Sequence, residues 1–173
     1  MIKILFAIGR LSVGGGEKLL VRQLQHIDRQ KFDPYLLTLF PEQKDSFEEM
    51  LYATVSEGAQ FFETRWKKMK FRGLFDAVSW FQLIRFLRKE KFDAVATSLF
   101  SANLIVRFAL LCAGAPAALV SYEHNIYADK HRWQIIADRF LARWTQKIIV
   151  DSEIVKRFTA EQERIPIDKF LTL

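Results

Sequence analysis

The sequence predicts an α/β fold, a doubly wound parallel sheet of at least six strands with helices on both faces. Short apolar runs, typical of strands buried on both sides, alternate with amphipathic stretches along the whole chain. Half of the 173 residues are hydrophobic and 27% are charged, which suits one compact domain with a sizeable core. Because the chain contains only 7 Gly and 4 Pro, we expect no flexible linker within it.

The first strand is expected at residues 2–8, where the run IKILFAI is almost entirely apolar. A helix follows the glycine-bearing loop, because Leu20, Leu24 and Ile27 recur at helical spacing. The next expected elements are a strand at 34–40, a helix at 45–56, a strand at 60–63 and an apolar helix at 73–90.

The second half of the chain repeats this alternation. Strands are expected at 93–98, 117–122 and 147–150, and a further strand begins at residue 170. Ser101 and Ser152 are predicted to cap the helices that follow two of these strands. The clearest amphipathic stripe in the chain consists of Trp133, Ile136, Ala137, Phe140, Leu141 and Trp144.

Crossovers in such a sheet are right-handed, so the loops that follow the strands all lie at one edge, where ligands of this fold class bind. The loops expected at this edge are 9–16, 40–45, 63–73, 98–101, 123–131 and 151–152. Any chemistry should be sought there.

The composition limits the classes of partner and of site that we expect. Lys and Arg number 26 against 20 Asp and Glu, a net charge of +6 that favours an anionic partner such as nucleic acid, acidic lipid or a phosphorylated substrate. Cys112 is the only cysteine, which excludes an internal disulfide and a thiolate metal cluster and favours a cytoplasmic location. No His, Asp or Glu spacing resembles a metal site, and no Ser-His-Asp set is evident.

Neither a signal peptide nor a membrane span is expected. The apolar run at 4–8 is shorter than a signal-peptide core. A longer apolar stretch at 94–122 is interrupted by polar residues, by Gly114 and by Pro116, so it is divided into strand, helix and strand.

The first candidate site is Gly14-Gly15-Gly16-Glu17, at the start of the first helix. Glycines let the backbone approach a ligand, and the N-terminus of the helix offers N–H groups to an anion. The dinucleotide motif G-x-G-x-x-G and the P-loop are both absent. The alternative is a flexible turn without a ligand.

The second candidate site is Glu123-His124-Asn125, at the end of the fifth expected strand. A histidine there can hydrogen-bond a substrate hydroxyl or phosphate, or transfer a proton. A histidine that only caps the following loop is the alternative, and the sequence leaves both interpretations open.

The third candidate is the basic segment of residues 65–72. It contains the basic residues Arg65, Lys67, Lys68, Lys70 and Arg72, interleaved with Trp66, Met69 and Phe71. Lysine and arginine attract anionic lipid, and the three apolar side chains are expected to insert into its surface. Single-stranded nucleic acid and a solvated loop are the alternatives.

The arrangement resembles the retaining glycosyltransferases of family 4, which have the GT-B fold of two Rossmann-like domains. Residues 14–17 resemble the family's G-G-x-E signature, and 121–125 resemble its strand that ends in histidine. Further similar segments are 93–98 with 101–105, 147–152, and 165–170, which resembles the segment before the interdomain linker. The resemblance covers the whole chain.

This resemblance implies that residues 1–173 are the N-terminal, acceptor-binding domain and that a C-terminal donor domain is missing. The complete enzyme would transfer a sugar from a nucleotide-sugar to a glycan or lipid-linked acceptor, in polysaccharide or lipopolysaccharide-type biosynthesis. No metal or other cofactor is implied. The fragment alone is expected to be inactive, and the protein is expected in the cytoplasm or at the cytoplasmic face of the inner membrane.

The resemblance also implies roles for single residues. His124 would contact the transferred sugar and stabilise the transition state, and Gly15 and Gly16 would approach the donor phosphates or sugar. Residues expected to line the acceptor side of the cleft are Gly14, Glu17, Ser98, Asn125 and Ser152. The basic segment would bind an anionic acceptor or an anionic membrane surface.

Two other function classes compete with this interpretation. A nicotinamide-dependent oxidoreductase lacks its glycine motif here, and no acidic residue fits the end of the second strand. A stand-alone basic module that binds anionic lipid or nucleic acid predicts salt-sensitive binding through Lys67, Lys68 and Lys70. Nucleic acid is not expected as a partner of the transferase.

Overall fold

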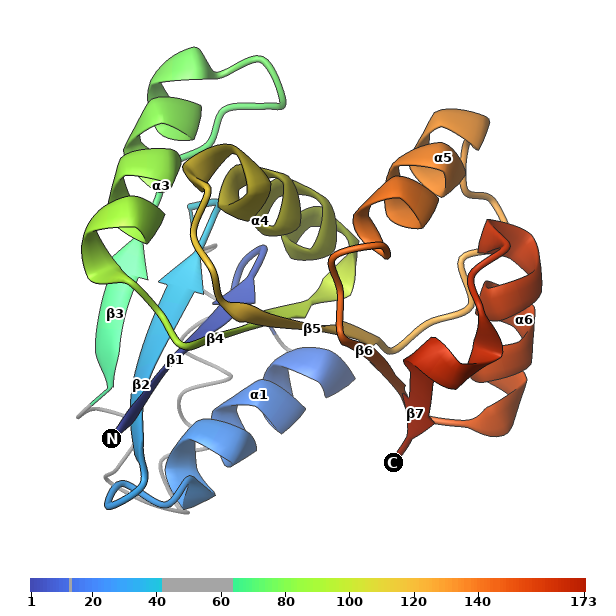
Figure 1. Cartoon of the computed structure of the whole chain (residues 1–173), viewed down its shortest axis with the longest axis horizontal. Coiled ribbons are helices and arrows are strands. Elements are labelled where there is room, and N and C mark those ends of the chain that lie inside the picture. Colours follow the sequence, from blue (N-terminus) through green and yellow to red (C-terminus); the bar gives the residue numbers. More distant parts are fainter. Residues whose placement is uncertain (13, 42–63) are drawn as a thin grey trace.

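The computed structural model describes residues 1–12, 14–41 and 64–173. Its seven strands form one parallel sheet of order β3-β2-β1-β4-β5-β6-β7 (Figure 1), which confirms the predicted fold class. The strands are β1 (Ile2–Ile8), β2 (Phe32–Thr38), β3 (Arg65–Lys68), β4 (Ala94–Ser98), β5 (Ala118–Glu123), β6 (Lys147–Val150) and β7 (Phe170–Thr172). The helices are α1 (Gly15–His26), α3 (Ala77–Glu90), α4 (Leu99–Ala113), α5 (Arg132–Leu141) and α6 (Glu153–Glu163), with a 3-10 turn, η2, at Ile167–Lys169.

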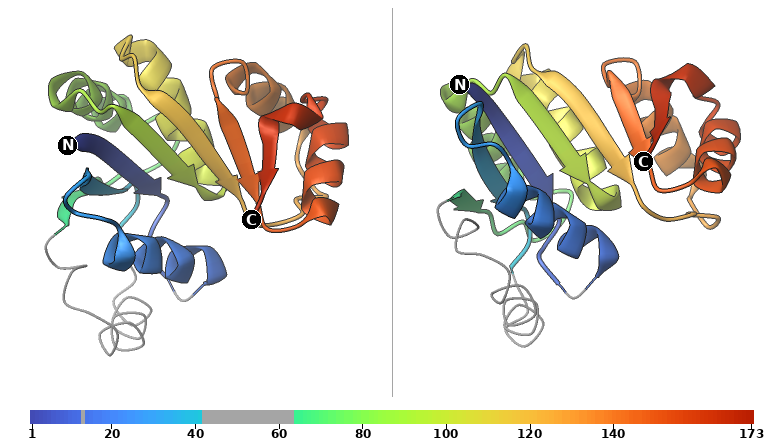
Figure 2. Two further views of the ribbon diagram at one scale, coloured as in Figure 1. Left: turned by 60° about the horizontal axis from the view of Figure 1, so that its bottom comes forward. Right: turned by 90° about the horizontal axis from the view of Figure 1, so that it is seen from below.

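Helices cover both faces of the sheet, with α1 on one face and α3 and α4 on the other (Figure 2). The residues of the central strand β1 explain why both faces of the sheet are covered. Leu5 and Ala7 belong to the core cluster that contains residues of α3 and α4, whereas Phe6 and Ile8 belong to the cluster beneath α1. Successive side chains of a strand point to opposite faces, so a strand buried on both sides is apolar throughout.

The observed boundaries refine the predicted ones. Strand β2 begins at Phe32 and contains Pro34, which is tolerated because β3 pairs with β2 only from Tyr35 onward. Helix α3 begins at Ala77 because the carboxylate of Asp76 caps it, accepting a hydrogen bond from the Ser79 backbone N–H at 3.2 Å. Ser98 is the N-cap residue of α4, so the prediction that Ser101 caps this helix is wrong.

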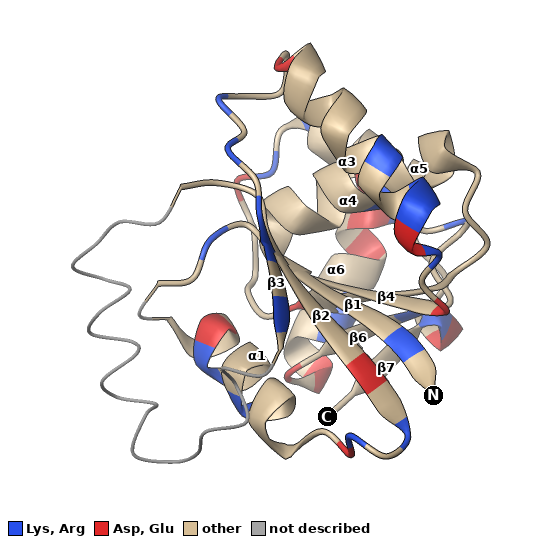
Figure 3. Cartoon of the chain, turned by 90° about the vertical axis from the view of Figure 1, so that its left-hand side faces the viewer, with Lys and Arg blue, Asp and Glu red and all other residues tan. Residues whose placement is uncertain are grey.

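The basic segment of residues 65–72 differs from its prediction. The helix expected at 45–56 and the strand expected at 60–63 lie outside the described residues, and the third strand of the described sheet is Arg65–Lys68. Strand β3 lies at the edge of the sheet and pairs with β2, and Figure 3 shows the positions of its Lys and Arg residues in blue. Met69 and Phe71 are each only 3% exposed. The expectation that these two side chains insert into lipid is therefore wrong, because they complete the core.

Replacing Phe71 with alanine is expected to destabilise the fold by about 3–5 kcal/mol, the usual cost of emptying a buried aromatic site. Its ring makes edge contacts with Phe40 and Trp80. Phe75 is 100% exposed, so Phe75→Ala is the matched control and should change stability by less than about 0.5 kcal/mol. Urea unfolding of both variants measures the difference; equal stabilities would contradict the core assignment.

Candidate functional site

The candidate site lies where the order of the sheet reverses. Strands β1 and β4 are neighbours, but the helices that follow them, α1 and α4, cover opposite faces of the sheet. Ligands of such sheets bind in the crevice outside the carboxyl ends of the strands at this point. The predicted Gly14–Glu17 motif begins α1 at that edge, and His124 follows β5 there.

Gly15 and Gly16 begin α1 but have different surroundings. A Cβ atom on Gly15 would meet nothing within 4 Å among the described residues. A Cβ atom on Gly16 would lie 3.0 Å from Cδ2 of His124 and 3.4 Å from Cδ2 of Leu99. Gly16 is therefore required by packing against His124, whereas Gly15 borders open space beside the N–H groups of the first turn of α1.

Glu17 stabilises the loop that leads into α1. Its side chain is buried and accepts a hydrogen bond of 2.6 Å from the Ser12 hydroxyl. A carboxylate in the first turn also interacts favourably with the positive end of the helix dipole. These contacts give Glu17 a structural role in holding the loop in place.

The imidazole of His124 is held in a defined orientation. Its Nδ1 lies 3.0 Å from both carboxylate oxygens of Asp151, which follows β6, and its side chain is 8% exposed. The ring stacks on Tyr122 with an interplanar angle of 22°. A carboxylate at Nδ1 favours the tautomer that donates from Nδ1. The other ring nitrogen, Nε2, then lies near Gly16, at the start of α1.

Tyr122 connects this histidine to α1. Its hydroxyl lies 3.3 Å from Nε2 of Gln23, an α1 residue. Burial raises the pKa of the Tyr122 phenol, so the ring is neutral at physiological pH. Tyr122 thus provides a flat, uncharged support beneath the imidazole.

Leu99 has a strained backbone. It is the first residue of α4, and its φ of 67° lies in the left-handed region that side chains with a branched or bulky group rarely adopt. The side chain of Leu99 packs with the core cluster beneath α1 and approaches Gly16. Strain of this kind costs on the order of 1–3 kcal/mol and persists where the surrounding structure imposes it.

The other predicted site residues lie at helix N-caps or at the exposed edge. Ser98 is buried at the N-cap position of α4, and the Ser152 hydroxyl caps α6 by accepting from the Val155 N–H at 3.3 Å. Asn125 is exposed at the edge, beside Tyr127.

The basic segment is not part of the same site. Strand β3, with Arg65, Trp66, Lys67 and Lys68, is separated from β5 by β2, β1 and β4. Lys70 and Arg72 follow that strand and are exposed.

A buried ionic cluster underlies the loop that carries His124. We define it as Arg107, Glu123, Lys130, Asp138 and Glu163, which come from four different elements and from the loop after β5. Lys130 Nζ lies 2.8 Å from Asp138 Oδ2 and 2.5 Å from Glu163 Oε1, and Arg107 lies 3.2 Å from Asp138 Oδ1. Glu123 accepts a hydrogen bond from Asn103 at 2.8 Å. These contacts fix both ends of the loop between β5 and α5.

The cluster contains three carboxylates but only two cations. Burial, together with the charge of Asp138, raises the pKa of Glu163 to about 7 and also raises the pKa of Glu123. Burial alone would lower the pKa of Lys130, but the three carboxylates outweigh it and raise that pKa. The folded protein therefore holds a proton in this cluster at a pH where the unfolded chain releases it.

Several of these residues were not singled out by sequence reasoning. The sequence predicts Asp151 at the ligand edge, but nothing in it indicates that this carboxylate contacts His124 at the end of the neighbouring strand. The available signal for the ionic cluster was Arg107, a lone charge within the apolar stretch 104–111. Leu99 has no sequence signal, because its strain arises from the direct passage of β4 into α4.

Within residues 1–12, 14–41 and 64–173, no three His, Cys, Asp or Glu side chains are grouped so as to hold a metal ion. None of the helices in these ranges is long and apolar enough to cross a membrane.

Stability is expected to fall as pH rises from about 5 to about 8, by on the order of 1–3 kcal/mol. The raised pKa values mean that the folded state binds more protons than the unfolded state in this window, so raising the pH favours unfolding. Glu123→Gln leaves two cations and two carboxylates and should reduce this slope by at least half. Urea unfolding at a series of pH values measures the slope, with exposed Glu161→Gln as the control; an unchanged slope in Glu123→Gln would refute the proton assignment.

The two glycines offer a matched pair of substitutions. Gly15→Ala adds a methyl group in open space and should be neutral or stabilise the chain by up to about 1 kcal/mol. Gly16→Ala forces a methyl group against His124 and should leave the protein about 1–2 kcal/mol less stable than Gly15→Ala. NMR of the imidazole should show a shifted His124 signal in Gly16→Ala alone. The packing argument fails if both variants leave that signal unchanged.

Solved structures share this fold at low sequence identity. Anabaena HepE in complex with UDP and glucose superimposes with a TM-score of 0.73 and 15% identity, covering 100% of this chain and 44% of HepE. The lipopolysaccharide outer core galactosyltransferase WaaB, in its apo form, gives 0.66 and 11%, covering 99% and 45%. A UDP-N-acetylglucosamine 2-epimerase from Rickettsia bellii gives 0.62 and 15%, covering 99% and 44%.

The chain thus spans less than half the length of each of these structures. At such identities the similarity establishes the fold. No curated protein sequence matches the chain. The family model described as Glycosyltransferase Family 4 matches residues 13–170, which is most of the chain. On this match the chain belongs to glycosyltransferase family 4.

Proposed function

We propose that residues 1–173 are the N-terminal, acceptor-binding domain of a two-domain GT-B glycosyltransferase. The complete enzyme transfers a hexose from a nucleotide-sugar to a hydroxyl of a glycan or lipid-linked acceptor, with retention at the anomeric carbon. The observation that carries this proposal is the imidazole of His124, which Asp151 orients and which lies on Gly16 at the start of α1.

The start of α1 suits the negatively charged and hydroxylated parts of a donor. Unpaired N–H groups and the positive end of the helix dipole attract phosphate oxygens. The open space at Gly15 allows a ligand to approach the backbone closely. HepE has been solved with UDP and with UDP-glucose, which supports a nucleotide-sugar as the partner proposed here.

His124 is proposed to act on the transferred sugar. With Nδ1–H donating to Asp151, Nε2 accepts a hydrogen bond from a sugar hydroxyl and holds the anomeric carbon in place. Positive charge develops at that carbon in the transition state of glycosyl transfer. The carboxylate of Asp151, acting through the imidazole, stabilises this charge.

The second domain is proposed to hold most of the donor, and the cleft between the two domains to contain the reacting atoms. The short length of this chain relative to its structural neighbours supports that division. On this proposal the domain alone does not turn over substrate. The enzyme needs no metal or other cofactor, and its products belong to polysaccharide or lipopolysaccharide-type biosynthesis.

The binding-module alternative is less favoured. Its central feature, the basic segment, forms an edge strand and contributes two buried side chains to the core.

An epimerase activity is also less favoured. The similarity to 2-epimerases is a likeness of fold, whereas the family match is to glycosyltransferases. Product analysis distinguishes sugar transfer from epimerisation, because an epimerase alters the nucleotide-sugar without any acceptor.

His124→Ala is expected to lower the transfer rate of the complete enzyme by about 10²–10³-fold, because it removes a contact made at the reacting sugar. Asp151→Asn should lower the rate by about tenfold, since the ring remains but loses its orienting carboxylate. Initial rates of sugar transfer measure both effects once a donor has been found by screening nucleotide-sugars.

His26→Ala provides the control, because His26 is exposed at the far end of α1 and should leave the rate unchanged. Thermal unfolding of each variant separates lost chemistry from lost folding. A His124→Ala enzyme with near-normal kcat and KM would falsify the proposed role of the imidazole.

A further inference from the structure

Two buried oxygen atoms at the end of β5 lack a hydrogen-bond donor. Within the part of the chain that the structure describes, neither Asn103 Oδ1 nor Glu123 Oε2 has a hydrogen-bond partner, although these residues are 0% and 3% exposed. Glu123 is the last residue of β5 and directly precedes His124, and Asn103 lies on α4. Buried polar atoms are nearly always paired, so two unpaired acceptors on side chains that touch each other require an explanation.

The Asn103 amide has already used its own donors. Its Nδ2 donates one hydrogen bond to the Tyr122 carbonyl oxygen at 3.0 Å and another to Glu123 Oε1 at 2.8 Å. An amide side chain has two N–H donors, so Oδ1 of Asn103 needs a donor from another group. An ionised carboxylate has no donor to offer, whereas a protonated one has an O–H.

The two cations of the ionic cluster bind its other carboxylates. Lys130 Nζ contacts Asp138 and Glu163 at 2.8 and 2.5 Å. Both terminal nitrogens of Arg107 donate to Asp138, one to the carboxylate and one to the backbone carbonyl. Among the described residues no hydrogen bond joins either cation to Glu123, whose carboxyl group accepts only from a neutral amide. Glu123 is therefore the carboxyl group of the cluster whose charged form is least stabilised.

An ion pair between Glu123 and Arg107 is the alternative arrangement. Arg107 Nε is likewise buried and without a hydrogen-bond partner in the described ranges. A contact between this N–H and an ionised Glu123 would pair Oε2 but would leave Asn103 Oδ1 without a donor. A proton on Oε2 pairs both oxygens, because a carboxylic acid donates one hydrogen bond and the amide oxygen accepts it.

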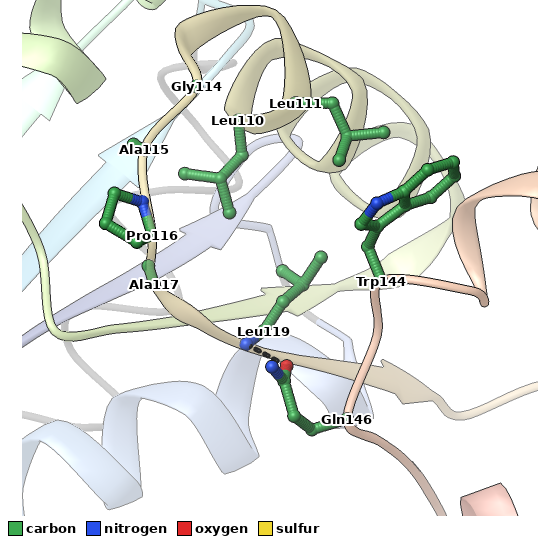
Figure 4. Close-up of a pocket in the computed structure, with 9 residues that line it drawn as sticks. All are labelled: Leu110, Leu111, Gly114, Ala115, Pro116, Ala117, Leu119, Trp144 and Gln146. Atoms are coloured by element: carbon green, nitrogen blue, oxygen red, sulfur yellow. Dashed lines mark hydrogen bonds between the residues drawn. The ribbon is translucent and has the colours of Figure 1, made fainter.

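The cavity at the end of α4 does not extend to these oxygens. It has a volume of about 380 Å³ and lies between α4 and Trp144 (Figure 4). Residues that line it include Leu110, Leu111 and the segment 114–117. Neither Asn103 nor any member of the ionic cluster is among its described walls, so this cavity supplies no donor for the two oxygens.

Charged and polar groups face the Glu123 carboxyl group from several elements. They are Asn103 and Arg107 on α4, Lys130 in the loop after β5, Asp138 on α5 and Glu163 on α6. Burial is the largest effect and raises the pKa of Glu123, and the charge of Asp138 raises it further, so that together they outweigh the attraction of Lys130 and Arg107. The pKa of Glu163 is also raised, to about 7, but its carboxylate has an ammonium group in direct contact.

We propose that Glu123 is protonated in the folded protein and forms a cyclic pair of hydrogen bonds with the Asn103 amide. In this pair Asn103 Nδ2–H donates to Glu123 Oε1, and Glu123 Oε2–H donates to Asn103 Oδ1. The second N–H of the amide holds the Tyr122 carbonyl oxygen. One side chain of α4 thus fixes the last two residues of β5, immediately before His124.

Asn103 and Glu123 are positioning residues for His124 in this arrangement. Tyr122, whose carbonyl Asn103 holds, carries the ring on which the imidazole stacks. Loss of the proton places a negative charge beside the carbonyl oxygen of Asn103, so the pair opens and the end of β5 is released. The location of the proton does not depend on the transfer reaction, whereas its effect on the rate rests on the proposed function.

NMR of the full-length protein with ¹³C-labelled glutamate locates the proton. At neutral pH the side-chain carboxyl carbon of Glu123 should have the chemical shift of a carboxylic acid, and that of exposed Glu161 the shift of a carboxylate. Glu123→Gln, Glu161→Gln and Glu163→Gln assign the three signals by their loss. The proposal is overturned if Glu123 is ionised at neutral pH, or if Glu163 carries the proton instead.

Two substitutions at Glu123 test the positioning role. Glu123→Gln replaces the O–H by an N–H that makes the same hydrogen bond, so it should keep the ¹⁵N signals of the His124 imidazole and a transfer rate within about twofold of the natural one. Glu123→Leu is similar in size but does not pair with the amide. We expect altered His124 signals and a kcat about tenfold lower, with KM little changed. Glu161→Gln, at an exposed position of α6, is the control and should change neither.

The pH dependence provides a second test that needs no destabilising variant. As the pH rises into the alkaline range, the kcat of the natural enzyme should fall and its His124 signals should shift, whereas Glu123→Gln has no proton to lose there and should keep both over a wider range. Identical pH profiles in the two proteins would overturn the positioning role, as would natural His124 signals and kcat in a folded Glu123→Leu variant. Failure of every nucleotide-sugar to support transfer would count against the proposed function alone, because the carboxyl and imidazole signals need no substrate.

Discussion

Seven parallel strands impose the constraint on which the other features depend. Parallel strands need crossovers, and crossovers of one hand bring every strand's carboxyl end to the same edge. Residues far apart in the sequence, such as Gly16, His124 and Asp151, therefore meet without a dedicated scaffold. The same arrangement buries both faces of the central strands, so β1 is apolar from Ile4 to Ile8, and its one charged residue, Lys3, pairs with Glu90 at the opposite end of the strand from the site.

The half of the sheet from β5 to β7 relies on charge as well as on apolar packing. Its apolar cluster is small, and its helices are joined through Arg107, Lys130 and Asp138. A buried ion pair adds little to stability compared with apolar packing, but removing one partner is costly. The network therefore defines the position of the loop between β5 and α5 more than it strengthens the fold, and that loop begins with His124.

The fold and most of the elements that carry the candidate site could be predicted from the sequence. Alternating apolar runs predicted β1, β4, β5 and β6 to within one residue at each end, because buried strands and amphipathic helices have distinct periods. The Gly14–Glu17 motif and His124 could be placed at one edge from topology alone. Their contact could not, because the packing of α1 onto β5 depends on twist and on the side chains of Tyr122 and Leu99.

The interpretation of residues 65–72 failed for a related reason. A short strand at the edge of a sheet is exposed on several sides, so Arg65–Lys68 has no apolar alternation that marks it as a strand. The positive charges of this segment favour lipid binding, and with such charges beside them Met69 and Phe71 resemble membrane anchors. In the structure both side chains lie in the core. Composition alone does not distinguish an apolar side chain that packs inward from one that faces a partner.

The position of β3 at the edge of the sheet indicates a second role for its positive charge. Among the described residues no strand pairs with the outer side of β3, so its backbone N–H and C=O groups form an open template for another chain. Arg65, Lys67 and Lys68 are exposed along it. Like charges on an edge strand repel an identical edge and hinder intermolecular β-pairing. Part of the chain's positive charge is therefore explained as protection against aggregation, which requires no anionic ligand at this edge.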